Sequence, residues 1–227
     1  MQLVTKESGV REPWRNMAKS KSKSKKRRNP LAGRSLNYGG LYPQSRRRRD
    51  QVITAIVVVI AAVGFGAYWW WSWASEAEFL ALAAKGEYAL AEIKTDISLG
   101  GGHFAAGETH TYQAQFPTSG IHHPVPTEPG FYETSRPPSQ LVHAVEHGHI
   151  VIYYERPGLD ALAKLKQWVA LYSGHWDGIV VTPMPGVGEK VVLTAWTKHL
   201  ILKRFDAAAA AAFIDKFRGR GPEKPVR

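Results

Sequence analysis

The longest apolar run in the chain extends from Val52 to Trp71, twenty residues without a charged side chain. Twenty helical residues, each rising about 1.5 Å, span about the 30 Å hydrocarbon core of a bilayer. Trp and Tyr residues crowd its far end, as in helices that reach the membrane interface. A cleaved signal peptide is the alternative, but its apolar region is usually shorter, about 7–15 residues. The run therefore predicts one transmembrane helix over 51–74.

Apolar residues after the run recur at shorter, mixed spacings, typical of a small folded domain. The helical spacing continues over 75–98 and is interrupted at Lys85-Gly86. A Gly- and Pro-rich stretch, 99–138, predicts loops with a short strand at Thr109–Phe116. The patterns that follow predict a strand at 149–155, a helix at 159–172, strands at 179–183 and 191–202, and a helix from the N-cap Asp206 to Phe217. This order favours the α+β class: a small mixed or antiparallel sheet with helices on one face.

Positive charge is concentrated before the apolar run. Residues 1–50 contain 15 Lys and Arg against 3 acidic residues, whereas 51–227 contain 15 against 16. The first segment is predicted to be a disordered, basic cytoplasmic tail, because Arg46–Arg49 adjoin the apolar run and flanking Lys and Arg stay on the cytoplasmic side. The outer domain is nearly neutral, so we expect it not to bind nucleic acid.

The chain contains no cysteine, which excludes a disulfide framework, a thiolate zinc site and an iron–sulfur cluster. Its nine histidines instead lie between His103 and His199, all of them beyond the predicted membrane helix. Imidazole is therefore the ligand on which a transition-metal site in the outer domain would depend.

One pair of histidines has the spacing of a metal motif. His143 and His147 enclose Glu146 in the sequence HAVEH, an H-x-x-E-H pattern. On a helix, residues four apart share a face, so both imidazoles could bind one ion. Zinc proteases of the inverted type use this pattern with the Glu as general base. Here Pro137-Pro138 and Gly148 limit any helix to one or two turns, which disfavours the protease interpretation.

A metal site without proteolysis is the hypothesis that we prefer. His103 and His122 lie in Gly- and Pro-rich loops, and loops on a rigid scaffold commonly present ligands. We expect His143 and His147, with His103 or His122, to bind copper or zinc, and Glu146 to stay in the second shell. Met184 could add a thioether. The alternative is that these histidines only pack and form hydrogen bonds.

Four stretches resemble one bacterial family, the domain of unknown function 3105. They are FPTSGIHHP at Phe116–Pro124, LVHAVEHGHIVIYY at Leu141–Tyr154, LTAWTKHL at Leu193–Leu200 and FIDKFRGRGPE at Phe213–Glu223. The resemblance implies a compact extracytoplasmic domain behind an N-terminal anchor and assigns no activity. The family positions that it indicates are His103, Ser119, Gly120, His122, Pro124, His143, Glu146, His147, Gly148 and Trp196.

Together these patterns predict a single-pass protein of the bacterial cytoplasmic membrane, with its N-terminus in the cytoplasm and its outer domain periplasmic. The expected parts are a tail at 1–50, a membrane helix at 51–74, a helical connector at 75–98, the outer domain at 99–223 and a tail at 224–227. We expect the lipid bilayer as a partner and a non-enzymatic metal-binding function. The alternatives are a structural or assembly subunit of a larger membrane complex and a metal-dependent hydrolase.

Overall fold

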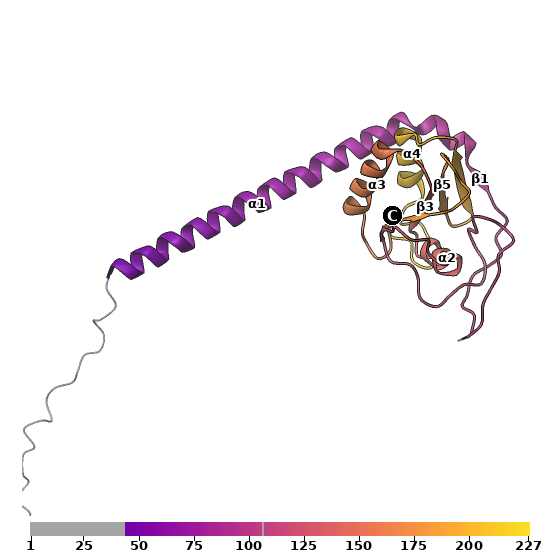
Figure 1. Ribbon diagram of the computed structural model, residues 1–227, viewed down its shortest axis with the longest axis horizontal. Coiled ribbons are helices and arrows are strands. Elements are labelled where there is room, and N and C mark those ends of the chain that lie inside the picture. Colours follow the sequence, from indigo (N-terminus) through magenta and orange to yellow (C-terminus); the bar gives the residue numbers. More distant parts are fainter. Residues whose placement is uncertain (1–43, 106) are drawn as a thin grey trace, which may run out of the picture. The chain divides into compact units, whose positions relative to one another are not determined.

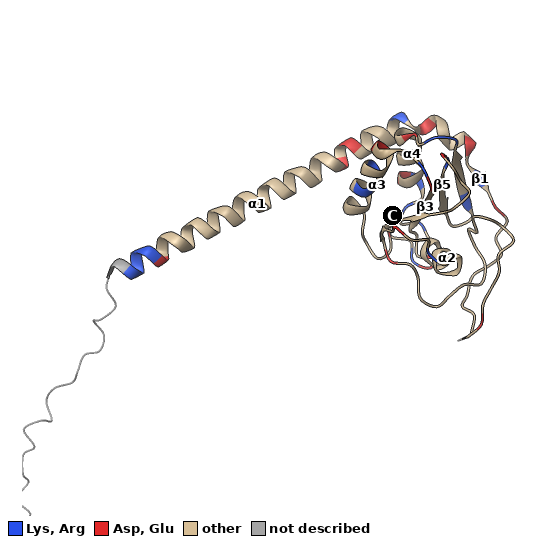
Figure 2. Ribbon diagram, in the orientation of Figure 1, with Lys and Arg blue, Asp and Glu red and all other residues tan. Residues whose placement is uncertain are grey.

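A long apolar helix, α1 (Gln44–Lys85), opens the described part of the chain. The computed structural model describes residues 44–105 and 107–227, so most of the predicted tail at 1–50 lies outside the described residues. The chain divides between Ala55 and Ile56 into a first unit and a second unit, Ile56–Arg227. The helix contains a segment long and apolar enough to cross a membrane, and its large apolar side chains from Val52 to Trp73 are exposed. Figure 2 shows it free of charged residues between Asp50 and Glu76.

The second unit is built on one six-stranded mixed sheet, in the order β1-β6-β5-β3-β4-β2 (Figure 1). Its strands are β1 (Lys94–Thr95), β2 (Gly130–Phe131), β3 (Ile150–Tyr154), β4 (Ile179–Pro183), β5 (Val191–Ala195) and β6 (Lys198–Leu202). Strand β4 pairs in parallel with both β3 and β2. The β1–β6, β6–β5 and β5–β3 pairs are antiparallel. Helix α3 (Leu159–Leu171) connects the parallel neighbours β3 and β4. The predicted α+β class is confirmed.

The central strands β3, β4 and β5 are buried on both faces of the sheet. Alternate residues of β3 point to opposite sides, so Ile150 and Ile152 join one core while Val151 and Tyr153 join another. The first core includes the end of α1, the 3-10 helix η2 (Glu87–Glu92), α3 and α4 (Ala207–Phe217). The second core is covered by α2 (Pro138–Glu146) and loops. The structure thus adds one short helix on the face opposite the other helices (Figure 1).

Two local predictions differ from the structure. The run 191–202, predicted as one strand, is a hairpin: β5 and β6 flank a turn at Trp196-Thr197, where Thr197 has a φ of 56°. The predicted strand at Thr109–Phe116 is a loop with bends. The predicted interruption at Lys85-Gly86 is confirmed, because α1 ends at Lys85 and η2 follows.

Gly86 lies where the end of α1 meets α4. A Cβ atom on Gly86 would lie 1.9 Å from the carbonyl oxygen of Ala208, so no side chain fits. The facing helix begins with six alanines, Ala207–Ala212, and is capped by the Asp206 side chain, which accepts from Ala209 N at 3.0 Å. Small residues on both sides allow the two backbones to come into direct contact.

Candidate metal centre

Helix α2 places two polar side chains on one face. Pro138 stands at its N-terminus, where a missing N–H costs nothing, and Gly148, at a φ of 98°, follows its end. His143 and Glu146 are three residues apart within it, so they share a face, and His147 is the C-cap. Leu141, Ala144 and Val145 fill the opposite face against the sheet. The helix has nine residues, about two and a half turns, slightly more than the limit of one or two turns set by the flanking Pro and Gly residues.

Two loop segments bring further histidines to this face. Residues 100–104 and 120–122 run parallel, with hydrogen bonds from Gly120 N to the Gly100 carbonyl, from His122 N to Gly102 and from Phe104 N to His122. His103 and His122 are directly paired in this short ladder. Their ring centroids lie 5.0 Å apart, and each is 4.7 Å from the His143 ring.

The result is a cluster of four ligating side chains, named here the inner group: His103, His122, His143 and Glu146. Each offers one ligand atom, and these atoms all lie within 4.8 Å of one another. His122 and His143 are buried, with 0% and 4% of their surface exposed, whereas His103 is exposed. The group is therefore a largely buried site with one side open to solvent.

Backbone carbonyls fix the tautomers of both buried rings. Nδ1 of His122 lies 2.8 Å from the Gly120 carbonyl oxygen, and Nδ1 of His143 lies 2.8 Å from that of His123. A carbonyl can only accept, so each Nδ1 carries a proton, and in the neutral ring Nε2 keeps a lone pair. Burial also lowers the pKa of His143 to about 4, which keeps that ring neutral near pH 7. Metal-binding imidazoles are commonly oriented by such carbonyls.

The close contact between His122 and Glu146 needs a cation, either a proton or a metal ion, between the two side chains. Nε2 of His122 lies 3.0 Å from Oε2 of Glu146 but makes no hydrogen bond among the described residues. At this distance only the alignment can fail, so a proton on Nε2 would not point at the carboxylate oxygen. Ligand atoms 2.0–2.1 Å from a tetrahedral Zn²⁺ are about 3.4 Å apart, close to this separation. A shared proton or a metal ion would relieve the contact.

A second cluster, named here the outer group, consists of His143, His147 and Glu223. Nε2 of His147 lies 3.0 Å from Oε2 of Glu223, and the His143 and His147 ring centroids are 4.6 Å apart. Burial lowers the pKa of His147, and the nearby Glu223 carboxylate opposes that shift. The outer group shares His143 with the inner group.

The structure thus divides the residues that the sequence singled out. His103, His122 and His143 come together, and Glu146 lies close enough to them to be a ligand and not only to support one. His147 instead groups with His143 and Glu223. Sequence reasoning did not select Glu223, although it closes the last of the four family-like stretches.

Met184, the further ligand that the sequence suggested, and Ser119, one of the family positions, have structural roles. Met184 packs against the core beneath α2, as expected of a lone methionine. The hydroxyl of Ser119 accepts a hydrogen bond from Leu99 N at 3.0 Å, which stabilises the local chain path.

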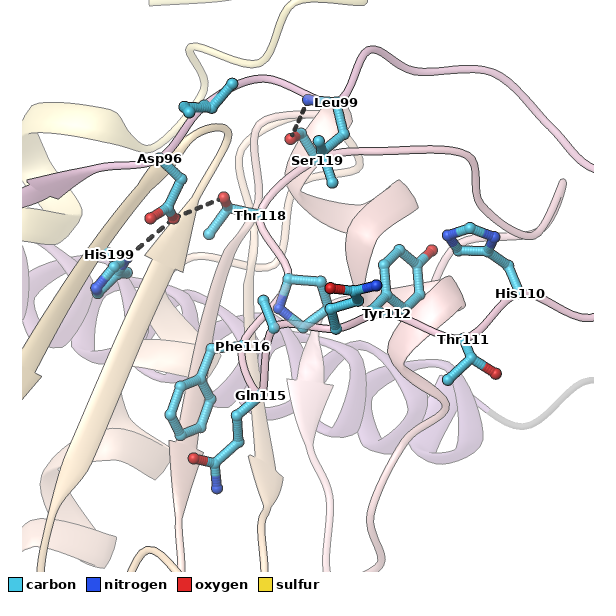
Figure 3. Close-up of a pocket in the computed structure, with 14 residues that line it drawn as sticks. Asp96, Leu99, His110, Thr111, Tyr112, Gln115, Phe116, Thr118, Ser119 and His199 are labelled. Carbon is cyan, nitrogen blue, oxygen red and sulfur yellow. Dashed lines mark hydrogen bonds and ion pairs between the residues drawn. The ribbon is translucent and has the colours of Figure 1, made fainter.

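A cavity of about 680 Å³ lies on the loops 96–99 and 110–119 (Figure 3). Its carboxylate, Asp96, accepts a hydrogen bond from Thr118 Oγ1 at 2.8 Å and pairs with His199 Nδ1 at 2.9 Å. No member of the inner group lines it. Because its carboxylate is already paired, we assign the candidate chemistry to the histidine clusters.

Comparison with known proteins agrees with the sequence resemblance. A family model described as "Protein of unknown function (DUF3105)" matches residues 103–227, a segment that begins at His103 and includes both groups. The searches of curated proteins and of solved structures gave no match. The matched segment covers more than half of the chain, and the chain therefore belongs to the DUF3105 family.

Proposed function

We propose that this chain is a membrane-anchored protein whose outer domain binds one divalent transition-metal ion through the inner group. Nε2 of His122 and of His143, a ring nitrogen of His103 and the carboxylate of Glu146 are the ligands. Three neutral imidazoles and one carboxylate suit Zn²⁺ or Cu²⁺. With no thiolate in the sequence, the site would not depend on a reducing compartment.

The observation that carries this proposal is the contact between His122 and Glu146. Both atoms are ligand atoms, they lie 3.0 Å apart without a hydrogen bond, and the carbonyl of Gly120 holds the His122 proton on the other nitrogen. A purely structural pair would place a proton between the two groups. A buried imidazole nitrogen and a carboxylate oxygen that lie 3.0 Å apart without an aligned hydrogen bond are the arrangement that a shared metal ion would produce.

The anchor is the exposed apolar part of α1. Exposed valine, isoleucine and tryptophan side chains from Val52 onward are stable only in an apolar surrounding such as lipid. The Arg46–Arg49 block supports an N-terminus in the cytoplasm of a bacterium, with the metal-binding domain on the periplasmic side.

The geometry favours binding over hydrolysis. In the H-x-x-E-H proteases both histidines bind the ion and the glutamate acts on a water molecule. Here Glu146 lies within the inner group, and His147 pairs with Glu223 instead. A glutamate that binds the ion is not free to serve as the general base.

Metal titration of the full chain in detergent tests the proposal. Binding at a hundredfold excess over Kd stabilises the fold by about 2.7 kcal/mol, so zinc or copper should raise the Tm of chelator-treated protein. His143→Ala and the isosteric Glu146→Gln should remove most of this rise, while His110→Ala, an exposed histidine outside both groups, should keep it. Metal-free purified protein with no response to zinc, copper or nickel would contradict the proposal.

One observation favours the assembly-subunit alternative as a second candidate. Ile97 and Leu99, at the cavity of Figure 3, are 88% and 71% exposed, unusual for large apolar side chains that lie together. A photo-crosslinker at position 99 should then capture one defined membrane protein. The same probe at Leu159, which is 84% exposed on α3, is the control and should not capture it.

A further inference from the structure

The inner and outer groups cannot both hold an ion, because they share one ligand atom. His143 uses Nδ1 to donate to the His123 carbonyl, so Nε2 is its only free nitrogen. That nitrogen can coordinate with the inner group or with His147 and Glu223, but not with both at once. The two groups are therefore neighbouring alternative positions for a single ion.

The side chains of the outer and inner groups differ in their exposure to solvent. The Glu223 side chain is 45% exposed, whereas His147 and His143 are 6% and 4% exposed. A carboxylate at the surface thus leads to two buried imidazoles and then to the buried His122. Each step joins ligand atoms within 4.8 Å of one another.

Hydrogen bonding makes the inner position the more stable one. Both buried inner rings donate their Nδ1 protons to carbonyl oxygens. An ion held by His147 through Nε2, the nitrogen next to Glu223, would force the proton onto Nδ1, which is buried and for which the nearby His175 backbone is too poorly aligned to complete a hydrogen bond. A buried donor without an acceptor is unfavourable, so the ion should rest in the inner group.

Close backbone packing holds the segment that carries Glu223 against the end of α2. A Cβ atom on Gly221 would lie 2.1 Å from the Glu146 carbonyl oxygen and 2.3 Å from Gly148 N, so the segment before Glu223 lies directly on the end of the helix. Gly219 N also donates to the Gly148 carbonyl at 2.9 Å. These backbone contacts position Glu223 against His147.

From these observations we propose that Glu223 and His147 form an entry position, at which an incoming ion is first bound and from which it passes to the inner group through His143. This inference rests on the proposed function, because it needs an ion that binds the inner group. It assigns the outer group a kinetic role: it speeds exchange of the ion and contributes little to its final affinity.

The test compares rates with affinities in the full chain in detergent, with Co²⁺ as the spectroscopic probe. Glu223→Gln should slow stopped-flow Co²⁺ loading and its release to a chelator at least fivefold, and should leave the equilibrium Kd within about twofold. Glu128→Gln, an exposed carboxylate near His175 and outside both groups, is the matched control and should change neither. His147→Gln should slow exchange like Glu223→Gln.

A second measurement detects the entry position directly. His103→Ala combined with Glu146→Gln removes inner ligands and should leave weaker Co²⁺ binding with an altered visible spectrum, which Glu223→Gln then abolishes. Unchanged exchange rates in Glu223→Gln, or a Kd raised more than tenfold through faster release, would overturn the entry position. Absence of Co²⁺ binding by the unaltered chain would instead overturn the proposed function.

Discussion

The ring of Phe79, near the end of α1, meets the ring of Trp168 in α3 edge-on, with centroids 5.6 Å apart and planes at 87°. Phe79 is 1% exposed, so the helix that carries the predicted membrane segment also contributes to the core of the outer domain. The predicted connector at 75–98 is thus partly an element of the fold.

Phe79→Ala should destabilise the domain by about 3–5 kcal/mol, because it deletes a buried aromatic ring and leaves a cavity. Leu80→Ala is the control: Leu80 is 46% exposed, and its substitution should change the stability by about 0.5 kcal/mol or less. Urea unfolding of the full chain in detergent measures both. Equal effects of the two substitutions would mean that α1 does not pack in this way.

Acid should weaken the metal-free domain. Burial lowers the pKa of His149 to about 4, below the value of about 6.5 in an unfolded chain. Between these two pH values the unfolded chain binds more protons than the folded chain does. The contribution of His149 to the free energy of unfolding is therefore complete above about pH 6.5 and is lost as the pH falls toward 4. The difference corresponds to about 3 kcal/mol.

His149→Gln should flatten this dependence, since glutamine can still donate to the His175 carbonyl, 2.7 Å from Nε2 in the structure, but does not titrate. The free energy of unfolding is measured from pH 4 to pH 8 in the presence of a chelator. Identical slopes for the variant and the unaltered chain would refute a role for His149.

Gly101→Ala should impair metal binding while sparing the fold. A Cβ atom at Gly101 would lie 2.2 Å from Oε1 of Glu146, the flexible end of a side chain that can rotate away at little energetic cost. We expect metal affinity to fall about tenfold, as is typical when a ligand's support is lost, with almost unchanged stability. Adding Gly101→Ala to Glu146→Gln should cause no further loss, and an additive effect would show that the two act separately.

Orientation in the membrane is testable with a reporter fused after Arg227, which should be active only outside the cytoplasm. Replacing Arg46–Arg49 with neutral residues should produce a mixed population, because flanking positive charge sets the direction of insertion. Cytoplasmic activity of the unaltered fusion would contradict the proposed topology.

Local signals made much of the fold predictable. Pro138 and Gly148 delimit α2 in the sequence, and the complete burial of β3 on both faces follows from its continuous apolar run. The hairpin at Trp196-Thr197 was missed because neither residue is the Gly, Asn or Asp that usually announces such a turn.

The site was predictable only where spacing along one helix decides it. His143 and Glu146 share a face because they are three residues apart. The pairing of His103 with His122 depends on the register of two loops, and Glu223 reaches His147 only through packing of a distant segment. No local pattern encodes these contacts, although the Gly- and Pro-rich surroundings of His103 and His122 do predict that both lie in loops.

The alanine run of α4 packs against Gly86 without immobilising a single side-chain torsion. Leucine or methionine loses rotamer freedom on burial, whereas alanine has none to lose. Packing of these two backbones therefore costs only the conformational entropy of the main chain. The same contact also lacks any side chain that could rearrange around an added atom, so Gly86→Ala should force the two backbones apart and cannot be absorbed locally.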